Sequence, residues 1–213
     1  MSDPLFSEPL RTYLDDLVPA RHPELARMEA YAREHDFPII GPASGQCCYV
    51  LSRLAGARRV FELGSGYGYS TAWFARAVME NGGGEVHHVV WDKDLSDRAR
   101  KHLAAIGVDG VVRFHVSEAV ETLRATPGQW DVIFMDIDKR GYPDAVPLIA
   151  ERLRKGGILI VDNMLWSGRV FDAADRSADT EAIRRATERL TRSPEWISTL
   201  VPIRDGLLVS YRT

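Results

Sequence analysis

The stretch VFELGSGYGYSTAWFA, residues 60–75, carries the clearest structural signal in this chain. An apolar run ends at Leu63, a turn with three glycines follows, and a helical pattern begins near Ser70. Glycines in such a turn permit positive φ angles and let a ligand approach the main chain, and the start of a helix offers unpaired N–H groups. The stretch therefore predicts a strand, a ligand-binding turn and a helix in succession.

The alternation of strands and helices continues along the chain. Strand patterns lie at 58–63, 85–91, 111–116, 131–137 and 157–163, and the helical patterns between them lie at 70–80, 94–106, 118–125 and 142–154. Such alternation predicts βαβ units and a parallel sheet, which is an α/β fold. After a helix near 179–192, the segments EWISTLVPI and GLLVSYR flank Arg204-Asp205-Gly206, which predicts a terminal antiparallel hairpin.

We expect one domain over residues 1–213, because a chain of this length can bury one sizeable core. The sheet core would span 58–213. Helical patterns at 8–17, 22–35 and 43–55 would form an N-terminal cover over 1–57.

The composition is that of an ordinary globular protein, with 45% hydrophobic and 27% charged residues. The formal net charge of −3 argues against a nucleic-acid partner, which usually requires a concentrated basic face. No apolar stretch approaches the roughly 20 residues of a membrane span, and the opening MSDPLFSEPL lacks the pattern of a signal peptide. We therefore expect a cytoplasmic protein that binds neither nucleic acid nor membrane.

The glycine turn indicates a cofactor other than a dinucleotide. The dinucleotide fingerprint would require a third glycine at the position of Tyr69, and Glu62 stands two residues before the first glycine. An acid there suits a cationic ligand, such as the amino or sulfonium group of S-adenosylmethionine. Asp92 follows the second strand pattern, where an acid can bind ribose hydroxyls, although it can equally cap the next helix.

Acidic residues end the next two strand patterns. Asp136 follows the run ending at Met135, and Asp162 and Asn163 follow the run ending at Val161. Because the carboxyl ends of neighbouring parallel strands share one edge, these three side chains should converge there. Oxygen ligands without Cys or His suit Mg²⁺. The alternative is that the acids only cap the helices that follow.

The sequence resembles the cation-dependent S-adenosylmethionine O-methyltransferases, the family of catechol and caffeoyl-CoA O-methyltransferases and their small bacterial relatives. The resemblance rests on GPASGQ, FELGSGYGYS, MDIDK, GGILIVDNMLWSGRV and PIRDGLLVS, and it covers nearly the whole chain. It implies a Rossmann-like class I methyltransferase fold, with a seven-stranded, mostly parallel sheet, a C-terminal antiparallel hairpin and helices on both faces. It also implies a homodimer and a small-molecule acceptor.

The resemblance also assigns roles to individual residues. Lys139 matches the catalytic lysine, and the metal ligands would be Asp136, Asp162 and Asn163. The expected contacts of S-adenosylmethionine are Ile40, Glu62, Gly64, Gly66, Ser70, Asp92, Glu118 and Asp136. The cation would be Mg²⁺, with Mn²⁺ or Ca²⁺ as alternatives.

These assignments predict a chemistry. A free phenol has a pKa of about 10, and a divalent cation that chelates two vicinal oxygens favours the ionised form. Lys139 would accept the proton, and the phenolate would attack the sulfonium methyl group. The expected acceptor is therefore a catechol-like molecule or another small vicinal diol. Val90 departs from the family pattern, because many relatives carry an acid there, and Asp92 would then replace it at the ribose.

Two other classes remain open. One is a protein of the same fold that acts without a metal, or on RNA or protein. The other is a nucleotide-binding module or dehydrogenase, which Tyr69 disfavours.

Overall fold

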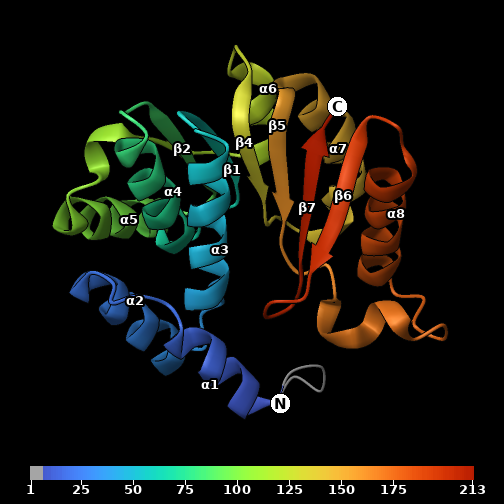
Figure 1. Cartoon of the computed structure of the whole chain (residues 1–213), viewed down its shortest axis with the longest axis horizontal. Coiled ribbons are helices and arrows are strands. Elements are labelled where there is room, and N and C mark those ends of the chain that lie inside the picture. The colour runs from blue at the N-terminus through green and yellow to red at the C-terminus, as the bar shows by residue number, and fades with distance from the viewer. Residues whose placement is uncertain (1–6) are drawn as a thin grey trace.

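The computed structural model describes residues 7–213, so the first six residues of the expected helical cover lie outside the described part of the chain. One seven-stranded sheet forms the centre, in the order β3-β2-β1-β4-β5-β7-β6 (Figure 1). The strands are β1 (Arg59–Leu63), β2 (Glu85–Val90), β3 (Val112–Val116), β4 (Trp130–Met135), β5 (Leu153–Val161), β6 (Trp196–Val201) and β7 (Leu207–Arg212). Strands β1 to β5 pair in parallel, and β7 is antiparallel to both of its neighbours. The predicted fold class is confirmed.

Helices cover both faces of the sheet. They are α1 (Glu8–Asp16), α2 (Pro23–Glu34), α3 (Gly41–Leu54), α4 (Tyr69–Glu80), α5 (Lys93–Ile106), α6 (Ala119–Ala125), α7 (Tyr142–Arg152) and α8 (Ala178–Arg192). One core cluster joins α2 to α5 to one face, and a second joins α6 to α8 to the other. Within residues 7–213, no helix is both long and apolar enough to cross a membrane.

The central strand β4 explains the two-sided core. Val132 and Phe134 pack on the side of α3 and α4, and Ile133 and Met135 pack on the side of α6 and α7. All four side chains are fully buried. A parallel strand with helices on both faces therefore has a continuous apolar sequence rather than an alternating one.

Strand β5 begins earlier than the sequence predicts, at Leu153 instead of Gly157. Its pairing with β4 shifts register between Trp130 and Val132, and Gly156 takes a φ of 76°. The glycine pair at positions 156 and 157 lies inside the strand, at this irregularity. Glycine at such a position allows a bulge that an L side chain would disfavour.

The carboxyl ends of β1, β4 and β5 meet at one edge of the sheet. Asp136 N donates to Leu63 O at 2.8 Å, and Asp162 N donates to Met135 O at 3.1 Å. The ladder thus extends one residue past each strand and fixes both acids at this edge. Helices α1 and α2 lie below it in Figure 1, so the N-terminal cover faces the site.

Candidate active site

The loop after β1 passes very close to the end of β4. Gly64 has a φ of 89°, and a Cβ added there would stand 2.1 Å from the main-chain oxygen of Asp136. Gly66 has a φ of 48° and lies beneath the ring of Phe37. Gly68, with a φ of 92°, precedes the first residue of α4. The glycines therefore permit both the left-handed turn and the close approach of the two loops.

A small cavity of about 40 Å³ lies over this loop. It is lined by Phe37, Pro38, Ile39, Ile40, Gly64, Ser65, Gly66, Tyr67, Tyr69, Ser70 and Asp136. Five of the eight predicted cofactor contacts, Ile40, Gly64, Gly66, Ser70 and Asp136, thus lie around one space. The residues came from three separate segments of the sequence, and the fold brings them together.

Glu62 lies behind this loop and is fully buried. Thr71 Oγ1 donates a hydrogen bond to its Oε2, and no residue between 7 and 213 bonds its Oε1. Burial raises the pKa of Glu62 to about 7, against the lowering effect of the hydroxyl groups of Ser70, Thr71 and Ser65. A buried oxygen without a partner fits a ligand that brings a hydrogen-bond donor, such as an amino group.

Asp92 and Glu118 both cap helices. Asp92 Oδ1 accepts hydrogen bonds from the main-chain N–H groups of Asp94 and Leu95, and Glu118 caps α6 through the N–H of Glu121. The side chain of Trp91, between Val90 and Asp92, is 73% exposed. Neither acid lines the small cavity, so the contact of Asp92 with a ribose and that of Glu118 with the cofactor stay predictions.

Lys139 follows β4 and points back to Asp136. Its Nζ donates to Asp136 Oδ1 at 2.7 Å, to Tyr142 Oη at 2.9 Å and to Ile137 O at 3.2 Å. Tyr142 in turn donates to the main-chain oxygen of Asp162 at 3.1 Å. Burial raises the pKa of the Tyr142 hydroxyl well above its ordinary value, so this phenol stays neutral and orients the amine.

Asp162 ends β5 and is 1% exposed. Arg204 Nη1 lies 3.1 Å from its Oδ2, while its Oδ1 has no hydrogen-bond partner in the described chain. Burial raises the pKa of the Asp162 carboxyl above its ordinary value, and the charge of Arg204 opposes that rise. The unpaired oxygen and the second carboxylate of Asp136 at the same edge fit a cation that prefers oxygen ligands.

Asn163 has a positive φ of 61° and donates from Nδ2 to Asp205 Oδ2 at 3.2 Å. The structure thus places all three predicted metal ligands at one sheet edge, although each is engaged with a different neighbour. Among residues 7–213, no three side chains of the His, Cys, Asp and Glu types gather around one point. The predicted set contains two carboxylates and one amide, so its role as a metal site stays a prediction.

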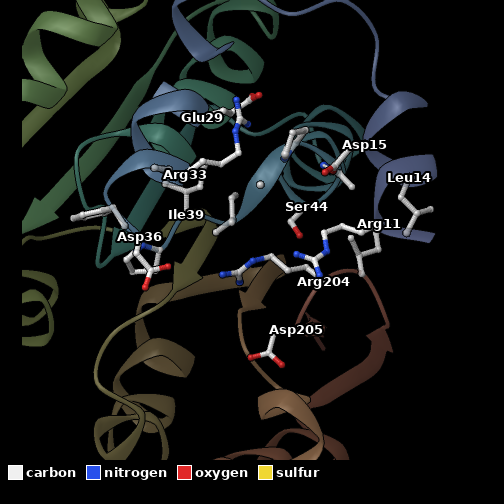
Figure 2. A pocket seen from close by; sticks show the side chains of 18 of the residues that line it. Arg11, Leu14, Asp15, Glu29, Arg33, Asp36, Ile39, Ser44, Arg204 and Asp205 are labelled. Carbon is white, nitrogen blue, oxygen red and sulfur yellow. Dashed lines mark hydrogen bonds between the residues drawn. The ribbon is translucent and has the colours of Figure 1, made fainter. Parts of the chain in front are cut away.

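A larger cavity of about 530 Å³ adjoins this edge. It lies between α1, α2, the start of α3 and the loop between β6 and β7. Figure 2 shows the side chains of Arg11 and Arg204 pointing into it from α1 and from that loop. Its volume is large enough for a small aromatic molecule.

Two neighbours of the site carry a larger role than the sequence indicates. The sequence suggests Tyr142, like Trp166 and Arg169, only as cover for a flat acceptor, and it marks Arg204 only as part of a hairpin turn. The contact of Arg204 with Asp162 could not be found from spacing, because it depends on the position of β7 beside β5.

Trp166 and Arg169 lie on the loop after β5, where the sequence suggests aromatic cover for an acceptor. The two side chains stack, with the Arg169 guanidinium carbon 5.5 Å from the ring centroid.

Together, the parallel sheet, the glycine loop and the acids at its carboxyl edge define a Rossmann-like cofactor-binding protein. The O-methyltransferase family profile matches residues 20–213, and the chain belongs to this family. This confirms the family resemblance seen in the sequence at the level of O-methyltransferases.

Individual relatives agree with this assignment. A protein of Mycolicibacterium smegmatis assigned to the O-methyltransferases is 31% identical over 175 residues, which are 81% of this chain and 82% of that protein. The crystal structure of the O-methyltransferase TomG from Streptomyces achromogenes, involved in tomaymycin synthesis and in complex with SAM, has a TM-score of 0.85 and 26% identity, with 96% of both chains covered. A methyltransferase from Geobacter sulfurreducens has a TM-score of 0.82 and 28% identity, with 98% of both chains covered.

Proposed function

We propose that this chain transfers the methyl group of S-adenosylmethionine to one hydroxyl of a catechol-like molecule or another small vicinal diol, with the help of a divalent cation. The observation that carries the proposal is the unpaired, buried Oδ1 of Asp162, which lies at the same sheet edge as Asp136 and Lys139. The cavity of about 530 Å³ beside it supplies room for the acceptor. The proposal extends to a homodimer on the strength of the family resemblance, and to a cytoplasmic location on the strength of the sequence composition.

The cofactor would lie along the β1 loop, with one part of it at the small cavity and the rest outside that cavity. Glu62 supplies a buried oxygen to the amino group, and Gly64 and Gly66 let the cofactor lie against the main chain. Ser70 at the start of α4 and Ile40 at the start of α3 line the same space. These groups would hold the sulfonium methyl at the carboxyl edge, facing the acceptor.

Asp136, Asp162 and Asn163 would hold the cation, which when bound favours the ionised form of a chelated hydroxyl. Lys139 is the proposed proton acceptor. Its side chain is 12% exposed and its Nζ is held by Asp136 and by the neutral hydroxyl of Tyr142. After it has lost one of its own protons to solvent, the neutral amine would take the proton of the acceptor hydroxyl by general base catalysis. Positioning the ionised oxygen in line with the methyl group supplies a large share of the rate.

A second candidate is an O-methyltransferase that needs no metal. It is favoured by Arg204, which already places a positive charge on Asp162 at 3.1 Å. Under this reading the guanidinium, rather than a cation, would neutralise the buried carboxylate.

The test is methyl transfer from S-adenosylmethionine to a panel of catechols, with Mg²⁺ and with excess EDTA. We expect turnover with Mg²⁺ that is lost with EDTA and restored by excess Mg²⁺. Turnover that survives EDTA would replace the proposal with the metal-independent candidate. If no catechol is methylated, but the cofactor is bound and Mg²⁺ raises the melting temperature, the assigned acceptor class is wrong.

A further inference from the structure

The ion pair between Arg204 and Asp162 joins two loops at the proposed cation site. Asp162 follows β5, and Arg204 lies 42 residues later in the loop between β6 and β7. Arg204 Nη1 is 3.1 Å from Asp162 Oδ2, and the two side chains are 33% and 1% exposed. A partly exposed guanidinium therefore neutralises a carboxylate that is almost completely buried.

The main chain on which Arg204 stands is held in place. Asp205 Oδ1 accepts a hydrogen bond from Ser167 N at 2.6 Å, and Asp205 O accepts one from Leu165 N at 2.8 Å. Met164 N donates to Gly206 O at 3.1 Å. With the bond from Asn163 Nδ2 to Asp205 Oδ2, four hydrogen bonds thus tie the hairpin loop to the loop after β5. Arg204 itself has a φ of 52°, a region that side chains rarely adopt. These contacts hold the main chain at Arg204 in place. The guanidinium can therefore change position only by rotation about the bonds of its own side chain.

The guanidinium has space into which it can move. Arg204 lines the cavity of about 530 Å³, and Figure 2 shows its side chain extending into that cavity. The main chain of Asp162, in contrast, is held by the sheet, because its N–H donates to Met135 O, and its side chain is 1% exposed. A cation that approaches Asp162 therefore meets a buried carboxylate that is already paired with a partly exposed guanidinium.

We propose that Arg204 competes with the divalent cation for Asp162: the guanidinium on Oδ2 opposes a cation at the unpaired Oδ1, and the cation binds tightly when the guanidinium moves toward the cavity. This inference rests on the proposed function, since it takes Asp136, Asp162 and Asn163 as the cation's ligands. A guanidinium and a divalent cation near one carboxylate repel each other strongly where water is scarce. Arg204 therefore weakens cation binding. It raises the concentration of the divalent cation that is needed to occupy the site formed by Asp136, Asp162 and Asn163.

The test is direct cation binding by the full chain with S-adenosylhomocysteine and without acceptor. Free Mn²⁺ is measured by electron paramagnetic resonance, and Mg²⁺ by its competition with Mn²⁺. In Arg204→Met, which keeps an unbranched side chain at this position but removes the guanidinium and its charge, we expect Mn²⁺ to bind at least about tenfold more tightly. Arg204→Lys keeps the charge and should bind Mn²⁺ within about threefold of the natural protein.

Arg11→Met is the matched control. Arg11 lines the same cavity, and it forms no ion pair with any residue from 7 to 213. Its removal should change the Mn²⁺ affinity by less than about twofold. Equal affinities for the natural protein and Arg204→Met would overturn the competition and leave the cation site standing. Absence of Mn²⁺ binding in both would overturn the cation site itself.

Discussion

Gly64 and the main-chain oxygen of Asp136 are in direct contact, so that a Cβ on the glycine would stand 2.1 Å from that oxygen. The loop after β1 and the loop after β4 thus hold each other in place where the cofactor and the acceptor would meet. The contact involves main chain on both sides, and a larger residue could be accommodated only by moving one of the loops. Cofactor binding and the position of Asp136 should therefore respond together to changes at Gly64.

Gly64→Ala should lower the free energy of unfolding by about 2–4 kcal/mol, because it combines a steric clash with a positive φ of 89°. Gly82→Ala is the control, because Gly82 has a φ of 95° but no atom within 4 Å of an added Cβ. It should cost only about 1 kcal/mol. Urea unfolding of both variants measures the difference. Equal losses would mean that the contact with Asp136 contributes nothing.

Glu62 should make stability depend on pH. Its pKa is about 7 in the folded protein, against 4.5 as the ordinary value. Because the folded pKa is raised, the folded state binds more protons than the unfolded state between these values. The free energy of unfolding therefore falls as pH rises through this window, by an amount on the order of 3 kcal/mol. Glu62→Gln should remove that part of the decline between pH 5 and pH 8 in urea titrations. An unchanged decline would assign it to other groups.

The cofactor should show the opposite pH dependence. An amino group that binds Glu62 favours the ionised carboxylate, so proton loss must accompany binding below pH 7. The Kd of S-adenosylhomocysteine should fall by about tenfold between pH 6 and pH 8. Calorimetry in buffers of different ionisation heat measures the released proton. In Glu62→Gln the affinity should be weaker and flat over this range. A pH-dependent Kd in that variant would contradict the assignment.

Lys139→Ala should reduce kcat by about 10²–10⁴-fold, the usual contribution of a general base. The Kd of S-adenosylhomocysteine should stay within about threefold, because Lys139 does not line the small cavity. Lys155→Ala is the control, since Lys155 is an exposed lysine at the opposite end of β5. Tyr142→Phe removes one acceptor of the amine and should move the acidic limb of the pH–kcat profile. A Lys139→Ala variant that retains full kcat would refute the base.

Asp131 should stabilise the amino end of the sheet. Its carboxylate accepts hydrogen bonds from the N–H groups of Arg58 and Arg59, both at 2.8 Å, and from Arg154 Nε at 2.6 Å. Burial raises the pKa of Asp131, but these bonds outweigh that effect and leave it below the ordinary value. The stabilisation is therefore present at neutral pH and is lost as pH falls through the folded pKa. Asp131→Asn should cost about 1–3 kcal/mol at pH 7. Urea unfolding at pH 7 and pH 3 tests this, and an equal cost at both would contradict it.

The fold could be predicted almost completely from the sequence. Continuous apolar runs such as VIFM in β4 belong to strands covered on both faces, and each helix pattern coincides with a helix within a few residues. The start of β5 was wrong by four residues. There a pair of glycines bends the strand without ending it, and a local pattern cannot distinguish a bulge from a turn.

The candidate site could be predicted in part. Asp136 and Asp162 lie at one sheet edge as the sequence predicts, because each follows a buried strand and parallel strands bring such positions together, whereas the role predicted for Lys139 comes from the family resemblance. Arg204 could not be found, because the sequence does not say that β7, rather than β6, pairs with β5. The cavity between α1, α2 and the hairpin loop also depends on packing between segments far apart in the chain.

The order of the last strands has a consequence for biogenesis. β6 comes before β7 in the chain but lies outside it in the sheet, so β5 keeps an unpaired edge until residues 207–212 have left the ribosome. An apolar strand with an open edge is a template for aggregation during synthesis. The nascent protein therefore passes through a stage in which β1 to β4 can have all their native neighbours, while β5 is paired with β4 only. During that stage chaperone protection matters most for this chain.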